Sequence, residues 1–152
     1  MTDLKLEKDI IIKRMEGIES EIVELKKLGE KSLEEFRAGD SWKLAQFHLH
    51  RALEGVFNIS SHILSRIPGG TATQYKEIAL KLGENKIVTE DFAKNALTQM
   101  AGYRNRLVHF YAEVKPEELY KIIKENLADI EVFLSSVKEV LSNPQKFGLE
   151  IE

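Results

Sequence analysis

Apolar side chains recur at alternating steps of three and four residues along most of this chain. Such spacing places them on one face of an α-helix, which must then bury that face against a partner. The first stripe runs over residues 11–25, the second over 45–63 and the last over 120–141. We find no two-residue alternation typical of a strand, no internal repeat and no interdomain linker. The pattern therefore predicts an all-α protein.

Several predicted helices begin at residues with a clear physical role. Ser32-Leu-Glu-Glu35 has the spacing of a capping box and predicts the start of a short helix. Thr89 is a suitable N-cap for a helix whose apolar face would carry Phe92, Ala96, Met100 and Leu107. Pro116 suits the first turn of the last helix, since no amide donor is needed there. These signals fix the order of the helices along the chain.

The predicted helices together suggest an up-and-down helical bundle of about five helices. Pro68-Gly69-Gly70 should end the second long helix, and a shorter helix over about 75–83 should follow it. A single long helix should run to Asn143-Pro144. We expect one domain over residues 1–152, with a core of about 4–142 and a loose C-terminal tail.

Composition excludes several classes of protein. With no cysteine, the chain has neither disulfides nor a zinc ribbon nor a catalytic thiol. A formal charge of −3 argues against broad, sequence-blind coating of nucleic acid but leaves room for a local RNA site. The charged N-terminal segment is unlike a signal peptide, and no apolar run approaches membrane-spanning length. We therefore expect a soluble, cytoplasmic protein with no membrane association.

Chemically versatile side chains gather between residues 100 and 111. Arg104 supplies a fixed cation suited to phosphate, His109 adds an imidazole that can donate or accept a proton, and Tyr111 adds a phenol. This set fits phosphodiester chemistry. On a straight helix Arg104 and His109 would lie roughly 140° apart, so they can converge only where the helix bends or ends. We therefore expect the motif to straddle a helix terminus. The alternative is structural, because arginine and histidine are ordinary partners of a helix C-terminus.

The run Met100-Ala-Gly-Tyr-Arg-Asn-Arg-Leu-Val-His-Phe-Tyr111 also resembles a known signature. Its order, Arg-x4-His-x-Tyr with asparagine directly after the arginine, is similar to that of the HEPN ribonucleases. With its additional tyrosine, the run resembles the HepT branch in particular, the toxin half of MNT–HepT toxin–antitoxin pairs. The likeness extends to the long second helix, to the short pair around Tyr75 to Lys86, and to Pro-Glu-Glu-Leu-Tyr120.

This resemblance implies a metal-independent endoribonuclease that needs no cofactor and acts as a homodimer on an RNA substrate. His109 would be the general acid or base, Arg104 would hold the phosphate, and Asn105 would orient one of them. Tyr111 would be the residue to which an MNT-type nucleotidyltransferase antitoxin adds AMP. Residues alone leave Tyr111 equally open to a plainer interpretation, a buried ring with a hydrated hydroxyl.

Other candidate sites are weaker. His48 and His50 lie two apart on a helix and point in different directions, so they should not share a metal ion. His62 lacks a ligand at suitable spacing on its own helix, and the chain has no Gly-rich loop for ATP. Glu54 and Asn58 could support the active site from across the bundle, although a solvated face is their more ordinary interpretation.

Two further functions remain open beside the nuclease. The chain could be a non-catalytic dimeric binding module that scaffolds a nucleotidyltransferase partner, or a plain helical bundle. Joint exposure of Arg104 and His109 in a cleft would distinguish the nuclease from the binding module.

Overall fold

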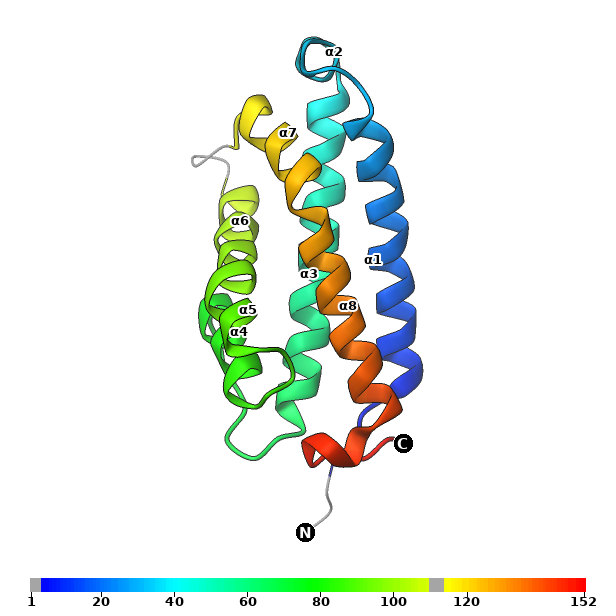
Figure 1. Cartoon of the computed structure of the whole chain (residues 1–152), viewed down its shortest axis with the longest axis vertical. Helices are drawn as coiled ribbons and strands as arrows, with labels where there is room; N and C mark the ends of the chain where they lie inside the picture. The colour runs from blue at the N-terminus through cyan, green and yellow to red at the C-terminus, as the bar shows by residue number, and fades with distance from the viewer. Residues whose placement is uncertain (1–3, 110–113) are drawn as a thin grey trace.

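Three long helices run side by side and form the main body of the computed structural model, which describes residues 4–109 and 114–152. They are α1 (Lys8–Gly29), α3 (Ser41–Ser65) and α8 (Leu127–Ser142). Helix α2 (Leu33–Ala38) joins α1 to α3 at one end, and α7 (Pro116–Glu125) leads into α8 (Figure 1). The predicted all-α bundle is confirmed, and its helix count agrees roughly with expectation.

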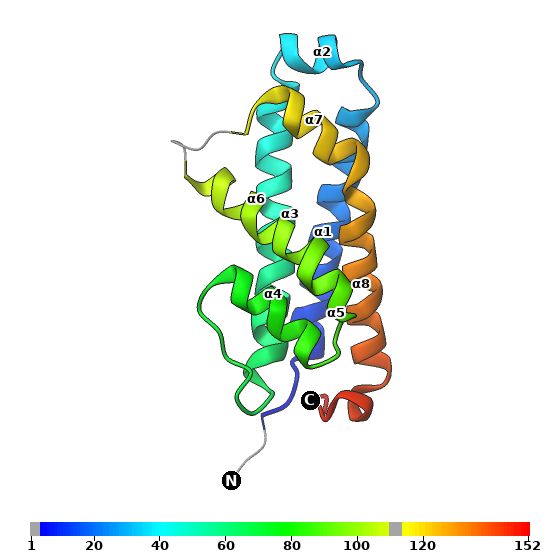
Figure 2. The same ribbon diagram turned by 60° about the vertical axis from the view of Figure 1, so that its left-hand side comes forward.

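A second layer packs on α3 and carries the motif. It consists of α4 (Tyr75–Glu84), α5 (Glu90–Phe92), the π-helical turn η1 (Ala93–Leu97) and α6 (Thr98–Val108). Figure 2 shows α6 crossing α3 obliquely. Within the described residues, no helix is both long and apolar enough to cross a bilayer.

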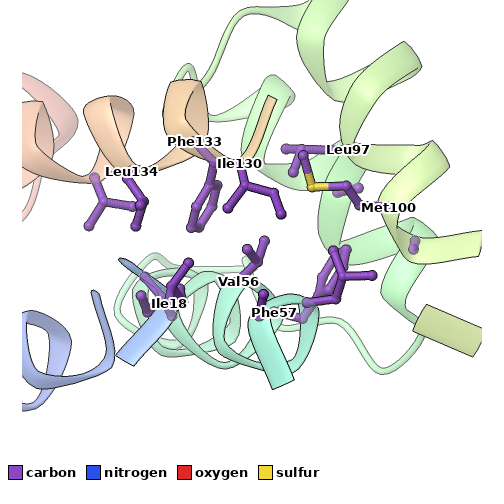
Figure 3. Close-up of a cluster of buried hydrophobic side chains, with 14 of the residues drawn as sticks. Ile18, Val56, Phe57, Leu97, Met100, Ile130, Phe133 and Leu134 are labelled. Atoms are coloured by element: carbon purple, nitrogen blue, oxygen red, sulfur yellow. The ribbon is translucent and has the colours of Figure 1, made fainter. Parts of the chain in front are cut away.

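The core fills the space between the three long helices and continues to where the second layer packs on them. Side chains of α1, α3, α6 with its preceding π turn, and α8 interdigitate there (Figure 3). Phe57, Phe133 and Leu97 are each at most 1% exposed. Burying so many aliphatic and aromatic groups is the main favourable term in folding, at roughly 1.5–3 kcal/mol per large side chain. Other members of this cluster are Ile18, Val56, Met100, Ile130 and Leu134.

The predicted helix starts are present with their hydrogen bonds. Ser32 accepts from the Glu35 amide at 3.2 Å while Glu35 accepts from the Ser32 amide at 3.4 Å, which completes the capping box. Thr89 accepts from the Phe92 amide at 3.1 Å, and Pro116 occupies the first turn of α7. Local sequence therefore sets these boundaries.

The apolar stripe predicted through Phe92 and Ala96 is wrong in detail. Ala93 and Leu97 are the fully buried residues of this stretch, whereas Ala96 is only partly buried. The π turn η1 spans this stretch. Its wider turn takes in an extra residue, so positions before it are rotated relative to those of α6. At the same level the chain is closely packed, because a Cβ on Gly83 would lie 2.7 Å from that of Ala93.

The predicted single last helix is also wrong, since it is divided at Asn126. This residue ends α7 and precedes α8, and its side-chain amide donates to Asp129 at 3.2 Å. Asparagine favours such local hydrogen bonds over continued helix.

The C-terminal tail is not loose, contrary to expectation. Residues Pro144–Phe147 form the 3-10 helix η3, and Leu149 is only 2% exposed. The Leu6 amide donates to the carbonyl of Glu150 at 2.8 Å, and the Glu152 amide donates to that of Leu6 at 3.0 Å. The tail is thus tied to the segment before α1, a long-range contact that local sequence does not encode.

Candidate active site

The motif lies at the C-terminal end of α6. Arg104 and Asn105 lie near the end of this helix, which ends at Val108. His109 is the C-cap, with extended backbone (φ −94°, ψ 102°), and its amide donates to the carbonyl of Asn105 at 3.2 Å. The expectation that the motif straddles a helix terminus is confirmed. His109 is exposed, and Tyr111 lies outside the described residues.

Arg104 is held on three sides. Its Nε donates to the carboxylate of Glu54 on α3, and its Nη1 donates to Oδ1 of Asn105 at 3.3 Å. The guanidinium carbon lies 4.1 Å from the centre of the Tyr75 ring on α4, within the range of a cation–π contact. Its side chain is only 19% exposed. The guanidinium is therefore fixed in one orientation before any ligand arrives.

Glu54 joins α3 to the motif through its contact with Arg104. It lies fifty positions before Arg104 in the chain. Nε2 of His50, one turn earlier on α3, is 3.9 Å from the same Glu54 oxygen. The plainer interpretation of Glu54 as part of a solvated face is wrong, because its carboxylate binds Arg104. Asn58 is exposed and, like Glu54, lines a groove between α1 and α3.

Tyr75, which contacts Arg104, and His50, which lies near Glu54, were not predicted as site residues. Tyr75 was predicted only as the start of the short helix over about 75–83, and its ring packs on Phe57, with 5.0 Å between ring centres. The same ring also supports Arg104. Nothing local signals that second role. His50 could have been found from its four-residue spacing to Glu54, which places both on one side of α3.

Asn105 makes a contact of the kind expected for an orienting residue. Its side-chain oxygen accepts from Arg104, while its backbone carbonyl accepts from His109. Asn105 therefore touches both proposed catalytic residues. Its role in orienting them stays a prediction.

Contacts with α7 and α3 fix the chain on both sides of residues 110–113. Arg106 donates through Nη1 and Nη2 to the two carboxylate oxygens of Glu118, each at 2.7 Å. This hydrogen bonding lowers the pKa of Glu118 and raises the pKa of Arg106. Val114 is buried, and its carbonyl accepts from the Gln46 side chain at 3.1 Å. The end of α6 is thereby tied to the start of α7.

The remaining histidines have separate partners. Nδ1 of His48 is 2.6 Å from Glu21, and Nε2 of His62 accepts from the Glu7 amide at 3.1 Å. Burial lowers the pKa of His62, and the nearby Arg66 lowers it further. Within residues 4–109 and 114–152, no three carboxylate or imidazole side chains gather as ligands for one metal ion.

These features define a class of protein: an all-α bundle in which the end of one helix presents an Arg-x4-His motif, with the arginine anchored by a carboxylate of a neighbouring long helix. The family model for ribonuclease HepT-like proteins matches residues 18–137. The chain therefore belongs to the HepT-like ribonuclease family.

Two relatives extend the likeness over most of the chain. The tRNA nuclease HepT of Aphanizomenon flos-aquae is 28% identical over 137 residues, which cover 90% of this chain and 92% of that protein. The mRNA nuclease HepT of Shewanella oneidensis is 27% identical over 133 residues, covering 86% and 97% respectively.

Solved structures share the fold. A tri-AMPylated HEPN toxin of Shewanella oneidensis in complex with MNT antitoxin superimposes with a TM-score of 0.78 and 23% identity. A toxin–antitoxin crystal structure with AMP-PNP gives a TM-score of 0.77 and 22% identity. Each match covers 86% of this chain and 98% of the other. At these identities the structures establish the fold alone.

Proposed function

We propose that this protein is the toxin of an MNT–HepT type toxin–antitoxin pair and cleaves RNA without a metal ion. The observation that carries the proposal is the fixed guanidinium of Arg104, held by Glu54 and Tyr75 at the end of α6, five residues before an exposed histidine. The two curated relatives, named tRNA nuclease and mRNA nuclease, support a nuclease but differ in target. We therefore propose RNA as the substrate class.

The proposed reaction uses the RNA's own 2′-hydroxyl. Its oxygen attacks the adjacent phosphorus as its proton leaves, and the bond from phosphorus to the 5′-oxygen breaks. The products carry a 2′,3′-cyclic phosphate and a 5′-hydroxyl. His109 acts as general base or acid, a role worth about 10²–10⁴-fold. Arg104 binds the phosphate and offsets the charge that develops on its oxygens. Asn105 holds Arg104 in place.

We propose a homodimer because the reaction needs two proton transfers and each motif has one histidine. Two copies whose α6 ends face a shared cleft would supply two. Light scattering at micromolar concentration should give twice the mass of the chain, and a monomer would remove the shared-cleft mechanism.

We propose that the partner is an MNT-type nucleotidyltransferase that adds AMP to Tyr111. Support comes from the Shewanella oneidensis toxin, which is tri-AMPylated and in complex with MNT antitoxin. A nucleotide beside Arg104 would place negative phosphate against the cation that RNA needs. The modification would thereby silence the nuclease.

A cleavage assay on purified protein tests the proposal. Arg104→Ala and His109→Ala should abolish cleavage while the far-UV circular dichroism spectrum stays unchanged, since neither truncation opens a core cavity. Arg37→Ala, which removes an exposed arginine of α2 paired with Glu117, is the matched control. EDTA should have no effect, and the product should carry a cyclic phosphate.

Two results would contradict the proposal. Activity lost with EDTA and restored by metal would exclude the metal-independent reaction. Parent protein that binds a nucleotidyltransferase but leaves RNA intact would favour the alternative of a non-catalytic scaffold.

A further inference from the structure

An open groove lies between α1 and α3 beside the proposed active site. Its volume is about 260 Å³. Glu54, which holds Arg104, is also part of the groove wall. The groove and the proposed active site are therefore continuous along α3. Charged and polar groups line it from both helices: Arg14 and Glu21 from α1, and Arg51, Glu54 and Asn58 from α3.

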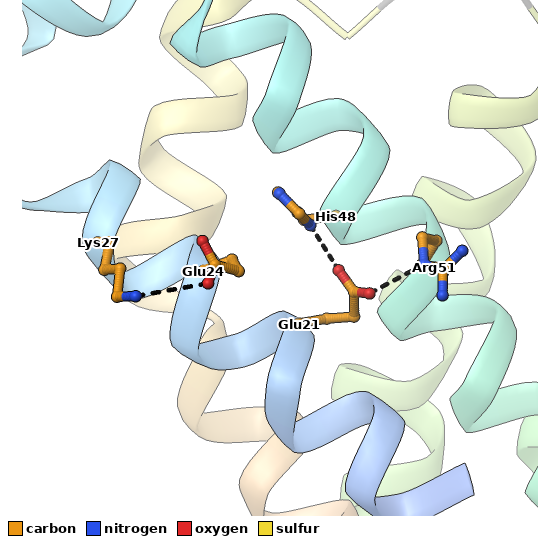
Figure 4. A network of polar contacts seen from close by, with 5 residues as sticks. All are labelled: Glu21, Glu24, Lys27, His48 and Arg51. Atoms are coloured by element: carbon orange, nitrogen blue, oxygen red, sulfur yellow. Dashed lines mark hydrogen bonds and ion pairs between the residues drawn. The ribbon is translucent and has the colours of Figure 1, made fainter.

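Arg51, one turn before Glu54 on α3, is oriented in the same manner as Arg104. Its Nε donates to a carboxylate oxygen of Glu21 on α1 at 2.9 Å, and its guanidinium carbon lies 5.4 Å from the centre of the Phe47 ring. Figure 4 shows Glu21 between His48 and Arg51, with one carboxylate oxygen directed to each. Nδ1 of His48 lies 2.6 Å from the second carboxylate oxygen of Glu21. The carboxylate therefore cannot rotate to accept from both terminal nitrogens of Arg51.

The other arginines are held differently. Arg106 uses both terminal nitrogens on Glu118, and Arg66 donates through Nε, Nη1 and Nη2 to three different groups. Arg37 is paired through Nη1. Among contacts within residues 4–109 and 114–152, Arg51 and Arg104 alone of the six arginines have Nε bound to a carboxylate and an aromatic ring against the guanidinium. Both terminal nitrogens of Arg51 can then donate to the oxygens of one phosphate, a paired geometry that the planar guanidinium of arginine favours.

We infer that Arg51 binds a second phosphate of the RNA, next to the one held by Arg104. The strand would follow α3 across Glu54 into the groove, where Arg14 adds a further cation. This inference rests on the proposed ribonuclease function and adds the course of the substrate. The side chain of Arg51 is 59% exposed, so it can receive a phosphate without rearrangement of the core. Glu21 is a positioning residue, since it acts only through Arg51.

The test compares short RNAs that differ in one charge. The parent and Arg51→Gln are measured for binding to an oligonucleotide with a 2′-deoxy sugar at the cleavage position, which cannot react. In matched oligonucleotides, each flanking phosphate in turn is replaced by a neutral methylphosphonate. At one flanking position the parent should lose about tenfold to a hundredfold in affinity, as expected for a hydrogen bond between charged groups. Arg51→Gln should lose nothing further at that position.

Cleavage provides an independent measurement. Arg51→Gln should raise KM for an oligonucleotide yet leave cleavage of a dinucleoside monophosphate, which has no flanking phosphate, at the parent rate. The number of ions released on binding, measured from the dependence of affinity on salt concentration, should fall by about one. Arg37→Gln is the matched control, as its side chain is similarly exposed, at 51% against 59%. Glu21→Gln should act in the same direction as Arg51→Gln but less strongly.

Failures of the two proposals are distinguishable. If the parent cleaves RNA but Arg51→Gln shows the same methylphosphonate profile as the parent, the inference is wrong and the nuclease assignment stands. If Arg51→Gln turns a dimeric parent into a monomer, Arg51 belongs to an interface between copies and the inference is again wrong. A parent that neither binds nor cleaves any RNA would overturn the proposed function and this inference together.

Discussion

The Nε of Arg104 on α6 donates to the carboxylate of Glu54 on α3, a residue fifty positions earlier in the chain. The pair is partly buried, with side chains 19% and 29% exposed. A carboxylate in this position orients the guanidinium. It also occupies Nε, so a ligand is bound by the terminal nitrogens. Activity should therefore depend on Glu54 although its carboxylate, which accepts from Arg104, is assigned no hydrogen bond to RNA.

Glu54→Gln should lower kcat by about tenfold to a hundredfold, because a misplaced catalytic group costs rate even when it is still present. Glu54→Asp should recover part of the loss, since it restores the charge at a slightly shorter reach. Kinetics on one defined oligonucleotide would separate kcat from KM. Glu24→Gln removes an exposed carboxylate of α1 paired with Lys27 and is the control. Equal kcat values for Glu54→Gln and the parent would rule out the positioning role.

Tyr111 is predicted to be the point of control by the antitoxin. Co-expression with a cognate nucleotidyltransferase should raise the mass of the toxin by one or more AMP units and silence cleavage. Tyr111→Phe should cleave RNA at nearly the parent rate, because the phenol has no assigned catalytic role, and it should escape silencing. Mass spectrometry of peptides would locate the adduct. An adduct on a different residue, or a Tyr111→Phe protein that is still silenced by modification, would contradict this prediction.

His62 should make stability depend on pH on the acid side of neutrality. Burial lowers its pKa below the ordinary value of 6.5, and the neutral ring accepts from the Glu7 amide before α1. Well above pH 6.5 the ring is neutral in both folded and unfolded chains. As pH falls below this value, the unfolded chain takes up a proton that the folded chain resists, so stability falls until the folded pKa is passed.

Urea unfolding between pH 7.5 and 5 would measure this effect. His62→Gln keeps an acceptor within the side chain but does not titrate, so its stability should fall less over that range. His62→Ala should be less stable than the parent at pH 7.5, where the lost acceptor leaves the Glu7 amide without its partner. Parallel curves for the parent and His62→Gln would show that His62 is not the titrating group.

Replacing either of two glycines in the long helices by alanine should change stability, in opposite directions for the two. A Cβ on Gly55 would lie 2.6 Å from Cγ1 of Ile18, which is buried, so Gly55→Ala should destabilise by roughly 1–3 kcal/mol. A Cβ on Gly17 would meet nothing within 4 Å. Gly17→Ala should therefore stabilise the fold by about 0.5–1 kcal/mol through helix propensity. Chemical denaturation of both variants would test the close approach of α1 and α3, and a stabilised Gly55→Ala protein would contradict it.

Local features of the sequence determined much of this protein. The three- and four-residue spacing indicated the helices, and Ser32, Thr89 and Pro116 marked where helices begin, because caps and proline act within one turn of the chain. The predicted end of a helix within the Arg-x4-His motif is likewise confirmed, with α6 ending at Val108. The same residues carried the resemblance to HepT, which the family match bears out.

Only the tertiary structure decided which helices bring their polar residues together. Glu54 and Tyr75 meet Arg104 because the register between α3, α4 and α6 is set by packing of their buried faces. That register depends on contacts among residues far apart in sequence, which no local spacing reports. The docking of the tail on Leu6 has the same cause. Local spacing determined the helices, whereas the burial of their apolar faces against one another determined the site.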